Sequence, residues 1–151
     1  MIIDSKSSET EAALNVAKLM LIAARTAPKA RGEDSIKTAI LTDEDKNRLG
    51  KVMDELGRTR DAQNVLDADA VVLIGVKLGQ TDEWRSFRAK LIDLGIAIGS
   101  AVKIASDLNV DNRVMHSVGL AAMKMGLLDA DEVQGIPLSV KGKNIFFDRK
   151  T

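Results

Sequence analysis

The chain has 151 residues, 45% of them hydrophobic, and its 22 basic and 22 acidic side chains give a formal net charge of zero at pH 7. This length suits one globular core, so we expect a single domain over residues 1–151. The balanced charge excludes a global basic field that would draw the protein onto nucleic acid or anionic lipid.

The sequence contains no cysteine and one histidine, His116. Disulfides, thiolate catalysis, cysteine-held iron–sulfur clusters and the usual metal sites are therefore excluded. The first residues, MIIDSKSSETEAA, are polar and charged, and no apolar run reaches about 18 residues. We expect a cytoplasmic protein without a nucleic-acid or membrane partner.

The first half of the chain predicts two helices and two strands. Residues from Glu9 to Ala27 favour a helix, which Pro28 ends because the residue before a proline leaves the helical region. Residues 35–41 predict a strand, and Thr42 with Asp45 resembles a capping box for a second helix. Gly57 and the polar run RTRDAQN weaken that helix, so its end is not predicted. Residues 70–76, AVVLIGV, predict a central strand buried on both faces.

A long helix is predicted from Thr81 or Asp82 to Leu108. Its polar residues in the second half form one narrow stripe, consisting of Asp93, Ser100, Lys103 and Asp107. We therefore expect this helix to be covered on nearly all sides. Gly95 and Gly99 allow another backbone to approach closely, and a second subunit is a candidate neighbour.

The remaining sequence predicts one helix and two strands. Asp111 or Asn112 is the expected N-cap of a helix that Gly126 closes. Its inward residues would be Val114, Met115, Val118, Ala121, Ala122 and Met125. A strand over residues 133–140 is expected at a sheet edge because it contains Pro137, and residues 144–147 are expected to form a short strand. This order of elements predicts an α+β fold.

Arg25, Lys29 and Arg31 surround Pro28 at the end of the first helix. Two interpretations fit this cluster. The cations either cap the helix C-terminus and solvate the turn, or bind a phosphate or carboxylate beside Gly32.

Asp111, Asn112 and Arg113 admit a similar choice. They either form a cap and a charged first turn, or lie where backbone N–H groups donate to an electron-rich ligand atom. His116 has no identifiable carboxylate partner, which favours an ordinary satisfied or exposed histidine over a catalyst. Lys141, Lys143 and Arg149 surround Gly142, where a hairpin turn is the simpler interpretation.

Three segments together resemble a known family. They are ARTAPKARG (residues 24–32), DLGIAIGSAVKIASDLNVDNRVM (93–115) and GIPLSVKGKNIFFDR (135–149). They resemble the uncharacterised ferredoxin-domain-containing proteins, whose fold is similar to that of the flavin-dependent nitroreductases. The resemblance implies a small mixed or antiparallel sheet flanked by helices, with a long buried central helix. It also implies a homodimer.

The same resemblance implies a flavin mononucleotide (FMN) between two subunits. Pro28, Lys29 and Ala30, flanked by Arg25 and Arg31, match the turn beside the isoalloxazine. Asp111, Asn112 and Arg113 match a loop with backbone donors toward its reactive edge, and Lys141, Lys143 and Arg149 match the phosphate region.

This sequence departs from the family pattern at two places. KLGQTDEWRSFRAK (residues 77–90) replaces a cysteine-rich segment, so no iron–sulfur cluster is expected. The polar N-terminus lacks the arginine-rich stretch that precedes the first helix in flavin-binding members. The implied function is a homodimeric FMN-dependent oxidoreductase that transfers hydride through the flavin. The alternative is a structural or anion- or nucleotide-binding module that has lost its redox centres.

Overall fold

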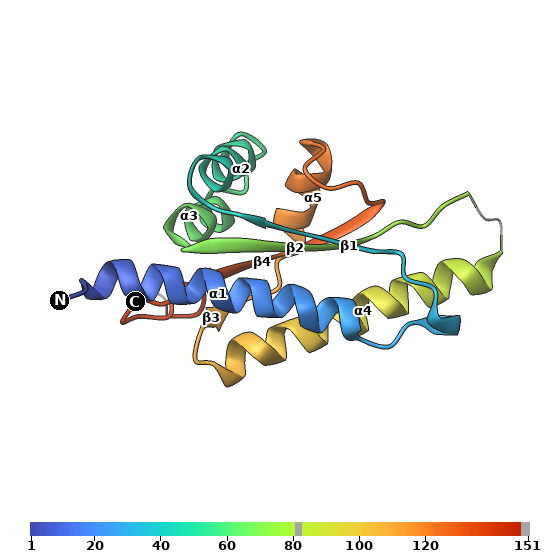
Figure 1. The fold of residues 1–151 in the computed structure, drawn as a ribbon. Coiled ribbons are helices and arrows are strands. Elements are labelled where there is room, and N and C mark those ends of the chain that lie inside the picture. Colours follow the sequence, from blue (N-terminus) through green and yellow to red (C-terminus); the bar gives the residue numbers. More distant parts are fainter. Residues whose placement is uncertain (81–82, 149–151) are drawn as a thin grey trace.

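The computed structural model describes residues 1–80 and 83–148 and confirms the α+β class (Figure 1). In chain order the elements are α1 (Ser5–Thr26), the 3₁₀ turn η1 (Ala30–Gly32), β1 (Ile36–Leu41), α2 (Asp43–Glu55), α3 (Thr59–Asp67), β2 (Ala70–Val76), α4 (Trp84–Asp107), β3 (Asp111–Asn112), α5 (His116–Lys124) and β4 (Glu132–Ser139). Within these described ranges, no helix is long and apolar enough to cross a membrane.

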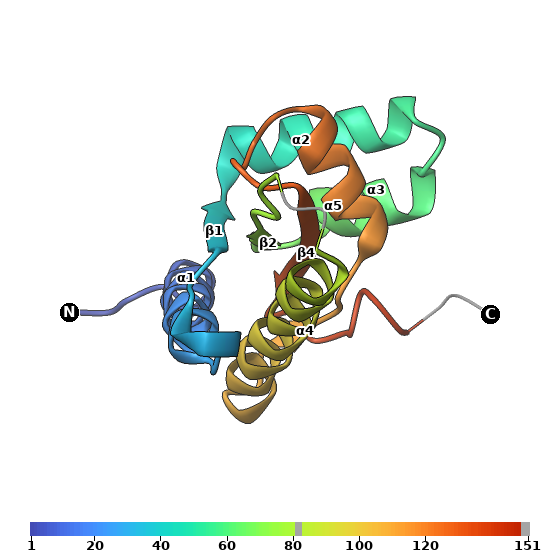
Figure 2. The same ribbon diagram turned by 90° about the vertical axis from the view of Figure 1, so that its right-hand side faces the viewer.

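The strands form one sheet with the order β1-β2-β4-β3, and every neighbouring pair is antiparallel. Helices α1 and α4 lie on one face of the sheet, and α2, α3 and α5 lie on the other (Figures 1 and 2). All seven residues of β2 are buried, which confirms the predicted central strand. Its unbroken apolar sequence follows from this position, because both of its faces are covered.

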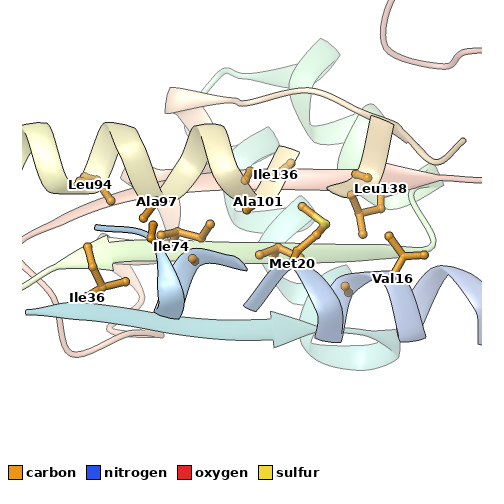
Figure 3. Packing of buried hydrophobic residues seen from close by; sticks show 14 of the residues in the cluster. Val16, Met20, Ile36, Ile74, Leu94, Ala97, Ala101, Ile136 and Leu138 are labelled. Carbon is orange, nitrogen blue, oxygen red and sulfur yellow. The ribbon is translucent and has the colours of Figure 1, made fainter. Parts of the chain in front are cut away.

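Two apolar cores lie on the two faces of the sheet. Val72, Ile74 and Val76 of β2 pack against α1 and α4, with Met20 and Ala97 among the contacts (Figure 3). The intervening residues of β2 face the other core, which α2, α3 and α5 complete. This alternation is the two-residue period of a β-strand.

Helix α4 buries only one side in the single chain. Leu94, Ala97, Ala101 and Ala105 are buried, whereas Ile92 is 54% exposed and Ile96 is 40% exposed. Gly95 and Gly99 lie on the same exposed side, and nothing lies within 4 Å of a Cβ added to either. The expectation that α4 is covered on nearly all sides is therefore wrong for one subunit. The predicted polar stripe is also wrong, because Asp93 is buried.

Pro137 does not mark a sheet edge, because β4 lies between β2 and β3. The N–H and C=O of Gly135 both bond to Met115, on the β3 side of the strand. Strand alternation turns Pro137 to that same side, where β3 consists of two residues that pair with Leu138 and Ser139. The missing N–H of Pro137 therefore removes no bond from the long ladder with β2.

Several predicted boundaries are also corrected. Helix α1 begins four residues before Glu9, with the carboxylate of Asp4 accepting a hydrogen bond from the Ser7 N–H. Thr42 precedes α2 but makes no side-chain capping bond, so the capping box is wrong. The run RTRDAQN opens the separate helix α3. The predicted start of α4 at Thr81 or Asp82 lies outside the described residues.

The C-terminal half differs in two further places. Asp111 and Asn112 form β3 and do not cap α5, whose N-cap is Met115; Val114 is exposed. Residues 144–147 form a turn in place of the predicted strand, because the Asn144 side chain accepts hydrogen bonds from the N–H groups of Phe146 and Phe147.

Candidate functional site

The turn after α1 uses two of its three cations internally. The Lys29 ammonium donates to the carbonyls of Ala24 at 3.0 Å and Ala27 at 2.7 Å, and also to that of Arg25. These carbonyls end α1 and have no helical partner, so Lys29 caps the helix.

Arg25 bridges the end of α1 and the start of β1. Its guanidinium donates to Asp34 at 2.6 Å and to the Ile36 carbonyl at 2.8 Å. Burial opposes ionisation of Asp34, but the hydrogen bonds from Arg25 and from the Ile36 N–H outweigh it, so the pKa of Asp34 is lowered. Arg25 is therefore occupied by a structural ion pair.

The turn η1 is held by a residue distant in sequence. The Ala30 N–H donates to both carboxylate oxygens of Asp93 on α4, at 3.0 and 3.3 Å. Arg31 has a positive φ of 57° and is exposed, and it has no partner in the described part of the chain. Of the predicted cluster, Pro28 and Arg31 face outward and are free to contact a ligand.

The predicted donors after α4 lie at the opposite end of that helix. The Asn112 amide donates to the Val110 carbonyl at 2.9 Å and the Ser106 hydroxyl at 3.3 Å. The Arg113 guanidinium stacks over Phe147, 5.5 Å from the ring centroid. Asp111 and Asn112 line an open cavity of about 410 Å³ together with residues of the C-terminal turn.

Arg113 also lines a second cavity, of about 230 Å³, at the start of α5. Arg58 and Arg113 bring two positive charges to it, and neither has an ion-pair partner within residues 1–80 and 83–148. The Ser117 hydroxyl donates to Asp61 at 2.6 Å, which ties α5 to α3. The first N–H groups of α5 face no capping side chain, so this corner suits an electron-rich group.

His116 lines the same cavity, and its Nδ1 lies 2.9 Å from the Gln134 amide. In the described structure no carboxylate orients the imidazole. This fits the expected role of an ordinary hydrogen-bonded histidine. The described residues also contain no cluster of His, Asp and Glu that could hold a metal ion.

The predicted C-terminal cations separate in the structure. Lys141 pairs with Asp69 at 3.3 Å and lines a cavity of about 310 Å³. Lys6, near the start of α1, lines the same cavity, and sequence reasoning missed it because the two lysines are far apart in the chain. Lys143 lines a different cavity, and Arg149 lies outside the described residues.

The cavity at Lys143 has a volume of about 570 Å³ and lies between α3 and the C-terminal turn. Arg60 of α3 also lines it, and neither cation has an ion-pair partner among the residues that the structure describes. Phe146 also lines the cavity, but it is 1% exposed, so its ring belongs to the core. Asp67 and Asp148 line the cavity as well, so its charges balance, and an anionic group would be held there by Arg60 and Lys143 locally and not by a net positive field.

Asn64 is the unexpected residue of this cavity. It is 8% exposed, lines the cavity, and makes no side-chain hydrogen bond to any described residue. Buried amides are normally hydrogen-bonded, so its donors and acceptor are available to a ligand or to water. One signal in the sequence points to Asn64, because it lies beside the buried positions Ala62 and Val65 of an amphipathic helix.

The two predicted halves of the site do not meet within one chain. The Pro28 turn contacts α4 at Asp93, whereas Asp111 and Asn112 follow the other end of α4 (Figure 1). The helix from Asp93 to Asp107 alone spans about 20 Å, given a rise of about 1.5 Å per residue. A single flavin cannot contact both groups in one subunit.

Comparison with known proteins identifies relatives of this chain. Residues 87–149 match the family described as "Uncharacterized protein containing a ferredoxin domain (DUF2148)". An uncharacterized protein from Archaeoglobus fulgidus is 35% identical over 180 aligned positions, which cover 99% of this chain and 98% of the relative. Because the chain has 151 residues, at least 29 of those positions hold residues of the relative only.

The similar solved structures have the nitroreductase fold. A nitroreductase-like family protein from Bacillus cereus has a TM-score of 0.70 at 9% identity, covering 100% of this chain and 94% of that one. The hypothetical oxidoreductase YcnD from Bacillus subtilis has a TM-score of 0.67 at 15% identity, and the NADPH:FMN oxidoreductase from Vibrio harveyi has 0.65 at 14%. Each covers 86% of this chain, which spans only 58% and 60% of their respective lengths.

Proposed function

Since the chain belongs to the family of uncharacterized proteins containing a ferredoxin domain and has the nitroreductase fold, we propose that it is a cytoplasmic homodimeric oxidoreductase that binds FMN. The similar Vibrio harveyi protein, an NADPH:FMN oxidoreductase, suggests the cofactor. The chain has no cysteine for a cluster, so redox chemistry would rest on the flavin alone.

The observation that carries the proposal is the unpartnered, nine-tenths buried Asn64 beside the unpaired cations of its cavity. The amide atoms of Asn64 are not among the fully buried unpaired atoms of the described residues, so they reach the cavity, where a ligand rich in acceptors and donors would take the place of water on them. FMN has such groups on its ribityl chain and a dianionic phosphate at one end. Arg60 and Lys143 would supply positive charge to the phosphate and Asn64 would supply an amide, while Asp67 and Asp148, which line the same cavity, would have to face away from the phosphate.

The second support for the proposal is the outer side of α4. Ile92, Gly95, Ile96 and Gly99 leave an apolar strip with room for close backbone approach, and Leu19 and Ile22 of α1 are also exposed, at 45% and 58%. In a two-fold dimer the same surface packs against itself. We propose that the α4 helices of two copies cross antiparallel at these glycines.

An antiparallel crossing would unite the separated halves of the site. The half of α4 that contains Asp93 in one copy would then run beside the half that ends at Asp107 in the other. Pro28 and Arg31 of one subunit would thereby approach Asn112 and Arg113 of its partner. Each flavin would be enclosed by both subunits, which explains why one chain alone presents two incomplete halves.

When bound, FMN would supply the hydride-transfer chemistry. This chain's residues would bind and orient the cofactor. The free N–H groups at the start of α5 and the Arg113 guanidinium would stabilise negative charge on an acceptor group. Pro28 would present a rigid, apolar wall that excludes water from one side.

One set of contacts favours a second candidate, a structural or anion-binding module without redox chemistry. Arg25, Lys29 and Lys141 are each bonded to groups of their own chain. Three of the cations expected at a flavin therefore stabilise the fold. Such a module would keep the fold and bind small anions without flavin.

Flavin content and oligomeric state test the two candidates. We expect protein purified from a flavin-supplied host to show the absorbance spectrum of bound flavin and to sediment as a dimer. A protein that stays colourless, and binds no added FMN in a titration of flavin fluorescence, contradicts the flavoprotein. Binding of inorganic phosphate by that colourless protein, followed by calorimetry, would support the anion-binding module.

A further inference from the structure

Asp93 of α4 is a buried carboxylate whose position the proposed chemistry does not explain. It is 6% exposed, and no cation is bonded to it in the described structure. Aspartate also has a low intrinsic preference for helix interiors. Arg31 and Lys90 line the same small hollow as Asp93 but are not bonded to it, so an apolar residue at this position would be expected to give a more stable helix packing.

Among residues 1–80 and 83–148, the hydrogen-bond partner of this carboxylate is the Ala30 N–H, which donates to both oxygens, at 3.0 and 3.3 Å. Ala30 precedes Asp93 by 63 residues and opens the turn η1. No other acceptor is bonded to the Ala30 N–H within the described ranges. The bond therefore links α4 to the turn that joins α1 and β1.

The turn needs such a link because its own backbone is unfavourable. Arg31 has φ 57° and Gly32 has φ 67°, so two consecutive residues adopt the left-handed region. A non-glycine residue in this region is uncommon and costs free energy. The internal bonds of the turn, from Gly32 to Lys29 and from Glu33 to Ala30, leave its orientation relative to α4 undefined.

We propose that Asp93 is a positioning residue, which fixes the orientation of the Pro28–Arg31 turn so that Arg31 and Pro28 face a ligand. The ligand part of this inference rests on the proposed function; the positioning of the turn does not. Asp93 would touch neither the flavin nor a substrate. It would act through the Ala30 N–H, at the expense of some stability of α4.

Amide exchange of Ala30, resolved by NMR on the full chain, tests the positioning without any ligand. In Asp93→Leu we expect exchange to be about tenfold to a hundredfold faster, as for the loss of one hydrogen bond to a charged group. Asp93→Asn keeps one carbonyl oxygen as acceptor and should restore slow exchange. Unchanged exchange at Ala30 in Asp93→Leu would overturn the proposal.

Ala30→Pro gives an independent variant in case Asp93→Leu does not fold. It removes the donor, and Lys29 already has the extended conformation that a following proline requires, with φ −128° and ψ 144°. In the wild-type background we expect a lower Tm and faster trypsin cleavage after Arg31, because Asp93 loses its donor. In the Asp93→Asn background, where no buried charge remains, the loss of Tm should be smaller. Equal losses in both backgrounds would contradict the link.

FMN affinity separates this inference from the proposed function. If both hold, Asp93→Leu weakens FMN binding severalfold and Asp93→Asn does not. A loosened turn with unchanged FMN affinity would show that Asp93 positions the turn but that the turn is not a wall of the flavin site. A protein that binds no FMN at all would refute the flavoprotein and leave the exchange result as the test of Asp93.

Discussion

Replacing Asn64 with leucine should separate a ligand-binding residue from a structural one. The substitution removes an amide that has no hydrogen-bond partner among the described residues, and it keeps the number and branching of the side-chain heavy atoms while making the side chain larger. Burial of an unpaired amide costs about 1–3 kcal/mol. Because Asn64 lines an open cavity, water makes some of the hydrogen bonds of its amide, and we expect a cost of about 1 kcal/mol.

We therefore expect Asn64→Leu to stabilise the ligand-free protein by about 1 kcal/mol, which corresponds to a Tm increase of about 2–4 °C for a chain of this size. The effect on FMN should have the opposite sign. Losing one hydrogen bond of about 1 kcal/mol weakens FMN binding about fivefold. The stabilisation that saturating FMN gives to the wild type should shrink by the same amount.

Thermal unfolding followed by circular dichroism, with and without FMN, measures both effects. Asn47→Leu is the matched control, because it makes the same replacement on an exposed position of α2. We expect it to change neither FMN binding nor Tm appreciably. A lower Tm of Asn64→Leu without ligand would refute the reasoning, since it would show that the amide is satisfied in the free protein and stabilises the fold.

Three further predictions concern other parts of the chain. Gly95→Leu should stabilise α4 of the monomer by about 1 kcal/mol, because leucine favours helix and no atom lies within 4 Å of the added Cβ. The same substitution should abolish the dimer in sedimentation, and an unchanged dimer would place the interface elsewhere. Lys29→Ala should lower Tm because Lys29 caps α1, whereas Arg31→Ala should leave Tm unchanged because Arg31 is exposed. In a fluorescence titration, Arg31→Ala should weaken FMN binding and Lys29→Ala should not. The reverse pattern would contradict the assigned roles. Burial lowers the pKa of Lys46 below its ordinary 10.5, so the unfolded chain holds this proton more tightly than the folded chain. As the pH rises from the lowered pKa toward 10.5, the stability of wild type relative to Lys46→Met should therefore increase. A difference in urea unfolding that does not change with pH would count against this.

The sequence predicts those features of the fold that depend on local apolar pattern. The unbroken run of β2 and the end of α1 at Pro28 follow from residues that are adjacent in the chain. The boundary between α2 and α3 does not, because Gly57 and a polar run are compatible with either a frayed helix or a new one. The side of β4 that Pro137 faces depends on pairing with Met115, which no local pattern encodes.

In the candidate site, too, local features are predictable from the sequence and tertiary partners are not. Pro28 and its neighbouring cations are visible in the sequence, but their roles depend on partners that only folding supplies. Arg25 meets Asp34 nine residues later, and Ala30 meets Asp93 after 63. Lys29 donates to carbonyls at the end of α1, as the capping interpretation predicts. Whether Arg31 and Arg113 serve a flavin remains a prediction.

The central strand β2 has a consequence for how the molecule opens. Its residues alternate between the two apolar cores, and β1 and β4 also contribute residues to both, so the sheet with β2 at its centre separates the α1 and α4 layer from the α2, α3 and α5 layer. Cooperative units of a protein follow such divisions. We expect β2 amides to exchange only on global unfolding, while each helical layer loosens separately at lower free energy. Asn64 and the start of α5 would then belong to one opening unit, and the Pro28 turn to the other.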